Sequence, residues 1–144
     1  MTKRKSPKVG YRVFVSHDTR DTWVAEQILK HIEDRGAIGF LDSRDIAGGD
    51  DIKQRIREEL EKSDELLILF TPWSIHRRWI HYEIGAADAL DKRIVCIFYN
   101  VTIEDFRADE GGVGPVEGLK TTAINELDTY FNEMQGRVAR REAG

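Results

Sequence analysis

Cysteine and proline are both scarce in this chain of 144 residues, which contains one cysteine and three prolines. The single cysteine, Cys96, cannot form an internal disulfide, and its apolar neighbours favour a small buried side chain over a reactive thiol. A chain without a disulfide framework suits a reducing compartment, so we expect a cytoplasmic location. Long hydrophobic runs are also missing. None approaches the roughly 20 residues of a membrane-spanning helix, and we expect no membrane partner.

Excess positive charge is missing as well, because the formal net charge is −4 and the pI is about 5.6. This balance does not favour nucleic acid as a partner. Residues 1–8 are locally basic, but they lack the apolar segment of a secretory signal, and we interpret them as a flexible tail. With 40% hydrophobic and 33% charged residues, the composition is that of one soluble globular domain.

Several motifs of well-known enzyme classes are absent. No G-x-G-x-x-G follows a predicted strand, and there is no P-loop, no G-x-S-x-G and no C-x-x-C. His76 and His81 are five residues apart, a poor spacing for a shared metal on a helix, so we expect neither a metal nor a bound cofactor. Thr71-Pro72 stands where a response-regulator receiver would carry its acceptor aspartate. These absences argue against hydride transfer, kinase-type phosphoryl transfer, zinc hydrolysis and aspartyl phosphorylation.

Apolar runs alternate with amphipathic segments along the chain, which predicts strands that alternate with helices. We expect strands at residues 9–16, 37–41, 66–70, 93–99 and 121–124, and helices at 21–35, from Asp50 or Asp51 onwards, at 75–91 and from Asn125 onwards. Residues 101–118 are assigned no element, and the charged chain after Gly136 is expected to fray. The alternation predicts a three-layer α/β fold of flavodoxin-like topology, with a parallel five-stranded sheet of order 2-1-3-4-5.

Polar residues stand at the predicted ends of two central strands. Ser16-His17-Asp18 follows the first strand, and Thr71-Pro72-Trp73 follows the third. In the predicted topology the switch point lies between these two strands, and ligands bind outside their carboxyl ends. Simpler roles are also open to these residues. Ser16 can cap a helix, as can Thr19 or Asp21, and His17 can lie at the surface.

Trp79 and Glu83 are four residues apart in the helix predicted after the third strand. Both side chains therefore lie on one face of that helix, about one turn apart. An aromatic ring beside a carboxylate can hold a sugar that carries a flat base. The alternative is that Trp79 packs in the core and that Glu83 is a solvated surface residue.

Three stretches resemble the TIR (Toll/interleukin-1 receptor homology) domain family. Residues 13–18 (VFVSHD) are similar to the family's first box, residues 44–50 (RDIAGGD) stand in the place of its BB loop, and residues 79–83 (WIHYE) match its W-x-x-x-E pattern. The resemblance covers residues 9–137, with 1–8 as a flexible tail and 138–144 as a frayed tail. Ala47-Gly48-Gly49 stands where the family's loop often has Pro-Gly, which makes this loop more flexible.

The resemblance implies an enzyme that cleaves NAD+, releases nicotinamide and gives ADP-ribose or a cyclic isomer. NAD+ is then a substrate, and no cofactor is implied. Glu83 is implied as the catalytic residue, and the substrate-binding residues expected with it are Trp79, Ser16, His17, Arg44 and Asp45. For Arg44 and Asp45 the alternatives are an ordinary loop charge and a turn former.

The resemblance also implies partners, and it leaves two alternative functions open. Self-association through TIR–TIR contacts, a separate sensor or effector protein and a role in bacterial antiphage signalling are expected for an NAD-cleaving member. The first alternative is a non-enzymatic scaffold that binds other TIR domains through residues 42–51 and helix faces. A weaker alternative is an enzyme similar to nucleoside 2-deoxyribosyltransferase, which has a similar fold and also depends on a glutamate.

Overall fold

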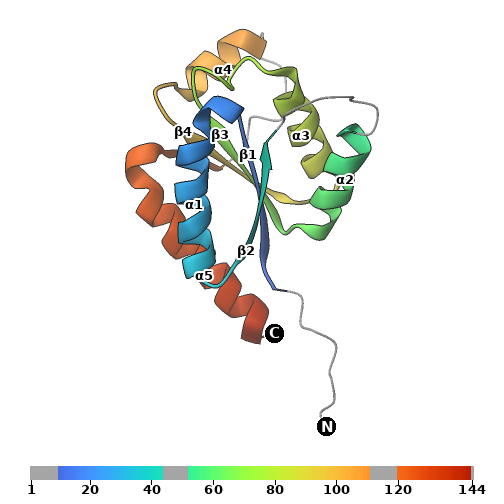
Figure 1. Cartoon of the computed structure of the whole chain (residues 1–144), viewed down its shortest axis with the longest axis vertical. Helices are drawn as coiled ribbons and strands as arrows, with labels where there is room; N and C mark the ends of the chain where they lie inside the picture. Colours follow the sequence, from blue (N-terminus) through green and yellow to red (C-terminus); the bar gives the residue numbers. More distant parts are fainter. Residues whose placement is uncertain (1–9, 44–51, 111–119, 144) are drawn as a thin grey trace.

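Five parallel strands form one sheet in a computed structural model that describes residues 10–43, 52–110 and 120–143 (Figure 1). The strands are β1 (Arg12–His17), β2 (Ile38–Ser43), β3 (Glu65–Phe70), β4 (Arg93–Phe98) and β5 (Lys120–Ala123). Their order is β2-β1-β3-β4-β5, and every neighbouring pair is parallel. The predicted α/β class and strand order are confirmed.

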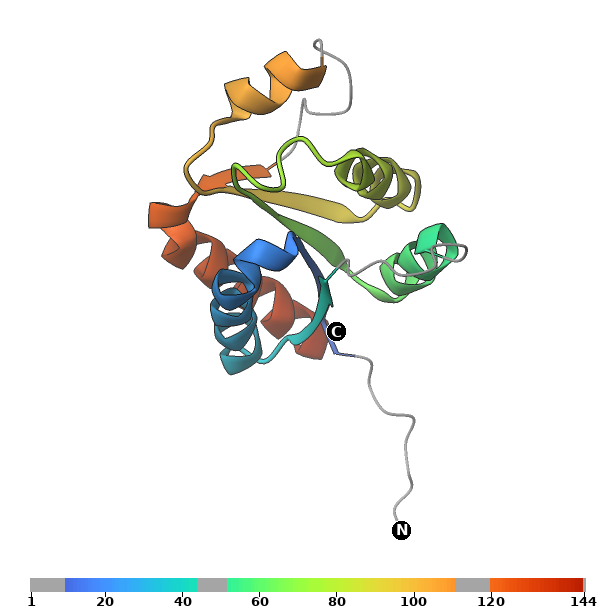
Figure 2. The ribbon, with the colours of Figure 1, turned by 45° about the horizontal axis from the view of Figure 1, so that its top comes forward.

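Helices cover both faces of this sheet. They are α1 (Thr22–Asp34), α2 (Ile52–Lys62), α3 (Arg78–Ala89), α4 (Ile103–Glu110) and α5 (Leu127–Ala143), with short 3-10 turns η1 (Thr19–Asp21) before α1 and η2 (Ile124–Glu126) before α5. Figure 2 shows α1 and α5 on one face and α2 and α3 on the other, which gives three layers. The α4 helix lies within residues 101–118, for which the sequence predicts no element. Its Phe106 packs on Phe70 of β3, with ring centroids 4.9 Å apart.

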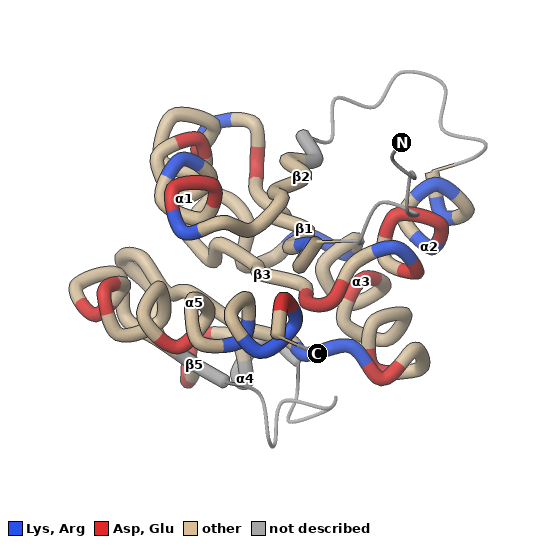
Figure 3. The backbone as a smooth tube through the Cα atoms, turned by 90° about the horizontal axis from the view of Figure 1, so that it is seen from below, with Lys and Arg blue, Asp and Glu red and all other residues tan. Residues whose placement is uncertain are grey.

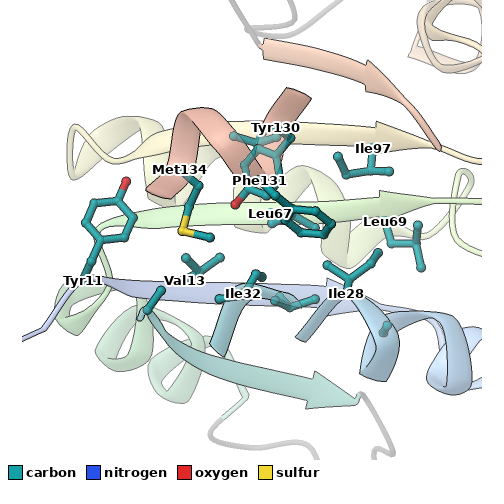
Figure 4. Close-up of a cluster of buried hydrophobic side chains, with 14 of the residues drawn as sticks. Tyr11, Val13, Ile28, Ile32, Leu67, Leu69, Ile97, Tyr130, Phe131 and Met134 are labelled. Atoms are coloured by element: carbon teal, nitrogen blue, oxygen red, sulfur yellow. The ribbon is translucent and has the colours of Figure 1, made fainter. Parts of the chain in front are cut away.

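Side chains that alternate along β1 divide the core into two clusters. Val13 and Val15 face α1 and α5, in the cluster that Figure 4 shows between these helices and the sheet. Phe14 faces the other way and belongs to the cluster beneath α2 and α3. The same alternation directs Ser16 toward α2 and α3 and His17 toward α1 and α5.

Two of the boundaries that differ from the prediction bear on the candidate site. The β1 strand includes His17, because its pairing with β2 continues to that residue. The α3 helix begins at Arg78, although a start near residue 75 was expected. A turn precedes it, in which the backbone N–H groups of Ser74 and Ile75 both donate to the carbonyl of Thr71. This turn takes up the first residues of the stretch that was predicted to be helical.

The α5 helix continues to Ala143, so the prediction of a frayed tail from residue 138 is wrong. Val138 is 4% exposed, and Nη2 of Arg137 lies 2.9 Å from Oε1 of Glu65, a fully buried residue at the start of β3. Figure 3 looks at this end of the molecule and shows the basic residues in the last turns of α5. The charged residues after Gly136 suggested a solvated tail. The sequence alone does not show that Arg137 has a partner, because Glu65 lies 72 residues away.

No helix within the described ranges is both long enough and apolar enough to cross a membrane. Cys96 is buried in β4, as its apolar neighbours predicted. Burial raises the pKa of its thiol to about 12. Because the thiolate is the reactive form, this thiol is largely unreactive near neutral pH.

Candidate active site

Glu83 is fully buried on the inner side of α3, with 0% of its surface exposed. The helix packs on the sheet through the buried stripe Ile80, Ile84 and Ala87. Glu83 lies beside this stripe and is covered with it, so the alternative of a solvated surface carboxylate is wrong. Burying a carboxylate costs on the order of several kcal/mol unless polar groups compensate it. Its position therefore requires a specific partner.

Ser16 provides such a contact, since its hydroxyl donates a hydrogen bond of 2.6 Å to Oε1 of Glu83. Ser16 is also 0% exposed, and it pairs in register with Ile68 of β3. The contact joins β1 to α3 at the topological switch point, where ligands bind in open α/β sheets. Ser16 lies within β1 and not at the start of a helix, so the helix-cap alternative is wrong. The structure thus brings these two candidate residues together.

His17 lies on the opposite face of the sheet from Ser16. Its Nε2 is 3.3 Å from the hydroxyl oxygen of Thr22, at the start of α1, and the side chain is fully buried. Successive residues of a strand point to opposite faces, and the structure does not bring His17 to Glu83. The alternative of a surface histidine is also wrong.

Asp18 links the start of α1 to the start of α3. Its Oδ1 accepts a hydrogen bond of 2.9 Å from the backbone N–H of Arg20, which caps η1. Its Oδ2 lies 3.1 Å from Nε of Arg77, the residue that precedes α3. Asp18 is 5% exposed, so its end of this ion pair is shielded from solvent. The ion pair connects the residue after β1 to the residue before the helix that carries Glu83.

Asp21 and Thr71 form a second link, between the loops that follow β1 and β3. The hydroxyl of Thr71 donates a hydrogen bond of 2.6 Å to Oδ2 of Asp21, and both residues are buried. Burial raises the pKa of Asp21; the hydrogen bond from Thr71 opposes this rise, and the charge of Asp18 adds to it. Asp21 is the N-cap residue of α1, one of the two candidates that the sequence offered, but its side chain makes no cap hydrogen bond and accepts from Thr71 instead. Sequence reasoning missed both links, although polar residues at two strand ends were their signal.

Trp79 is half-buried and packs against the cluster beneath α2 and α3. It also lines a cavity of about 500 Å³ between these two helices. The other described lining residues are Ile52, Lys53, Ile56, Arg78 and Tyr82. Trp79 therefore combines the two roles that the sequence left open, because it packs on the core and also forms the wall of a cavity. Glu83, one turn further along α3, faces Ser16.

Arg44 and Asp45, the remaining predicted substrate-binding residues, lie outside the described residues, as does the BB-loop-like stretch 44–50. Their roles stay predictions. The described part of the candidate site consists of Glu83 with Ser16, the two links at the strand ends, and the cavity beside Trp79.

Comparison with known proteins shows a matching family model and several similar proteins. The family model of the TIR domain matches residues 13–128. A probable 2′ cyclic ADP-D-ribose synthase, TcpO of Methanobrevibacter olleyae, is 23% identical over 91% of this chain and 39% of its own length. A probable 2′ cyclic ADP-D-ribose synthase, BdTIR of Brachypodium distachyon, is 28% identical over 66% of this chain and 43% of its own length. The chain thus spans less than half the length of these two relatives.

A receptor protein and two solved structures are also similar to this chain. Toll-like receptor 1 of Homo sapiens is 28% identical over 51% of this chain and 10% of its own length. The TIR domains of the activated Roq1 resistosome match with a TM-score of 0.52 and 17% identity, over 90% of this chain and 84% of that chain. A diflavin flavoprotein from Nostoc sp. matches with a TM-score of 0.55 and 15% identity, over 94% of this chain and 98% of that chain. At these identities the two solved structures show the fold alone.

Proposed function

The chain belongs to the TIR domain family, and from that premise we propose that it is an NAD+ glycohydrolase or ADP-ribosyl cyclase. Such an enzyme cleaves the bond between nicotinamide and ribose and gives ADP-ribose or a cyclic isomer. The observation that carries the proposal is the buried carboxylate of Glu83, held by Ser16 at the switch point of the sheet. The two relatives whose names describe cyclic ADP-ribose synthases support it.

The chemistry of NAD+ explains why a single carboxylate is sufficient. The bond that breaks joins C1′ of the ribose to the cationic nitrogen of nicotinamide. Its electron pair goes to that nitrogen, so nicotinamide leaves as a neutral molecule and needs no proton from a general acid. Most glycosidases need a second carboxyl group for that protonation. The oxygen of water, or of a hydroxyl in the same molecule, then bonds to C1′ and loses its proton, which gives the linear or the cyclic product.

In this mechanism Glu83 stabilises the positive charge that develops at C1′ and accepts hydrogen bonds from ribose hydroxyls. Charge stabilisation is most effective when the charged group is already oriented and shielded from water. Burial of Glu83 provides the shielding, and the hydrogen bond from Ser16 provides the orientation. Ser16 thereby acts as a positioning residue for the catalytic carboxylate.

Glu83 has no exposed surface in this structure, so a substrate can reach it only after the side chains around it move. We propose that self-association opens the site, triggered by a separate sensor or effector protein, as in antiphage signalling. Two exposed tryptophans support a contact surface, because Trp23 is 71% exposed and Trp73 is 50% exposed. The guanidinium of Arg20 stacks 4.3 Å from the ring centroid of Trp73. Tryptophan and arginine are the residue types most enriched at the energetic centres of interfaces.

A direct assay tests the enzymatic proposal. The purified chain is incubated with NAD+ over a range of protein concentrations and with a crowding agent, and nicotinamide is measured by chromatography. We expect nicotinamide release that rises more steeply than protein concentration, and the retained product identifies linear or cyclic ADP-ribose. Absence of nicotinamide under all these conditions would overturn the proposal.

A non-enzymatic scaffold is the second candidate, and the exposed side chains of Trp23 and Trp73 favour it. A scaffold assembles at high concentration without turnover. Light scattering measured in parallel with the nicotinamide assay separates the two functions. Assembly without nicotinamide supports the scaffold, and assembly with nicotinamide supports the enzyme.

A further inference from the structure

The cavity between α2 and α3 combines two aromatic rings with two cationic side chains. Trp79 and Tyr82 contribute rings from α3, while Lys53 and Arg78 contribute positive charge, one from each helix. Ile52 and Ile56 complete the described lining with apolar surface. A volume of about 500 Å³ lies within the usual range for small-molecule sites, roughly 300–1,000 Å³, and such sites are mostly apolar with a few placed polar groups.

Lys53 is positioned at this cavity by Tyr82. The hydroxyl of Tyr82 donates a hydrogen bond of 3.1 Å to the backbone carbonyl of Lys53, and Nζ of Lys53 lies 5.5 Å from the centroid of the Tyr82 ring. Both contacts join α2 to α3 across the cavity. The lysine charge is thereby held beside an aromatic wall, and the opposite helix places the Arg78 charge at the same cavity.

We propose that this cavity binds the adenylate half of the dinucleotide, with the adenine ring against Trp79 and Tyr82 and phosphate oxygens on Lys53 and Arg78. The inference rests on the proposed function for the identity of the ligand. Phosphate pairs favourably with both cations, and a flat base buries its faces against aromatic side chains.

The two halves of the substrate differ in charge, and this difference assigns the cavity to one of them. The nicotinamide ring of NAD+ is cationic, so Lys53 and Arg78 repel it. Adenine is neutral, and the phosphates next to it are anionic. Trp79 lies one turn before Glu83 on α3. A dinucleotide anchored in the cavity by its adenylate half therefore directs its nicotinamide–ribose bond along α3 toward Glu83.

Binding of AMP to the purified chain, measured by isothermal titration calorimetry, tests this inference without requiring catalysis. We expect AMP to bind more tightly than adenosine and than nicotinamide mononucleotide. Lys53→Ala and Arg78→Ala should each weaken AMP binding about tenfold or more, because each removes a charge-assisted contact. The matched controls Lys30→Ala and Arg140→Ala remove exposed cations of other helices and should leave AMP binding unchanged.

Catalytic assays of the same variants separate this inference from the proposed function. We expect Lys53→Ala and Arg78→Ala to raise KM for NAD+ more than they lower kcat, whereas Glu83→Gln retains AMP binding. Nicotinamide release with an unchanged KM in both cavity variants would overturn the cavity assignment and leave the enzyme proposal intact. AMP binding that depends on Lys53 and Arg78, without nicotinamide release, would support the adenylate site and remove the enzyme proposal. If AMP binds no better than adenosine, the inference is wrong.

Discussion

Two glutamates are fully buried at opposite ends of the sheet, and they have different surroundings. At the amino end, Glu65 accepts hydrogen bonds from the hydroxyls of Tyr11, at 2.5 Å, and of Tyr130, and it forms an ion pair with Arg137. At the carboxyl end, Glu83 accepts a hydrogen bond from the neutral hydroxyl of Ser16. Glu65 is thus surrounded by donors and a cation that belong to the protein.

Their places in the fold separate a structural carboxylate from a candidate catalytic one. Burial and the charge of Glu65 raise the pKa of Tyr11 and Tyr130, so both remain protonated and keep donating. The donors come from Tyr11, the residue before β1, and from α5, so Glu65 holds the last helix to the sheet. Glu83 instead lies at the switch point, beside the helix turn that borders the cavity. We propose that a carboxylate there stabilises a positive charge in the substrate.

Replacing Glu83 is expected to have the largest effect on activity. Glu83→Gln keeps the shape of the side chain but removes the charge that stabilises the transition state, so nicotinamide release should fall by about 10²–10³-fold or more. The control Glu26→Gln makes the same chemical change at an exposed position of α1. Equal activity of Glu83→Gln and wild type would show that Glu83 is not the catalytic carboxylate.

Replacing Glu65 should give the reverse result, with a loss of stability and little direct effect on catalysis. Glu65→Gln leaves Arg137 partly buried without its carboxylate, and breaking such a pair costs about 3–5 kcal/mol. Urea unfolding measures this loss, with the exposed Glu33→Gln as the control. Activity per folded molecule is compared at low temperature, where the variant remains folded. A full loss of activity in folded Glu65→Gln would break the distinction between the two glutamates.

Removing the Ser16 hydroxyl tests whether it positions Glu83. Ser16→Ala should lower kcat/KM about tenfold, because a hydrogen bond to a charged group contributes roughly 1.5–3 kcal/mol. The carboxylate form of Glu83 also loses a donor that favours it. We therefore expect the acidic limb of the pH–rate profile to move to higher pH. A lower rate with an unmoved acidic limb would indicate a packing defect instead.

The smallest expected effect concerns Asp21 and follows from its raised pKa. An acid whose pKa is higher in the folded state binds protons more tightly there, so it favours folding at low pH. That contribution is lost as the pH rises through the folded-state pKa. Asp21→Asn should therefore raise Tm slightly at pH 7, and this gain should disappear near pH 3. The amide oxygen introduced by this substitution can still accept the hydrogen bond from Thr71. Thermal unfolding at the two pH values measures the difference, and a lower Tm at pH 7 would contradict it.

Local patterns were sufficient to predict the sheet and its order. They work because a strand repeats every two residues and a helix every 3.6, so a short window of sequence already shows which face is apolar. The same windows failed at α5. The charged residues after Gly136 predicted a frayed tail, yet Arg137 pairs with Glu65, 72 residues away in the sequence. Local composition does not reveal such a partner.

For the candidate site, the sequence by itself determined the residue types, their order and the family to which they belong. W-x-x-x-E places Trp79 and Glu83 on one helix. The predicted strand ended at residue 16, so the sequence did not show that Ser16 and His17 point to opposite faces of β1. Only the tertiary structure decided which of these residues meet. The Ser16–Glu83 hydrogen bond spans 67 residues of sequence, and the cavity requires α2 to pack beside α3. The physical reason is that periodicity directs a side chain toward a face, whereas its partner there depends on how distant elements pack.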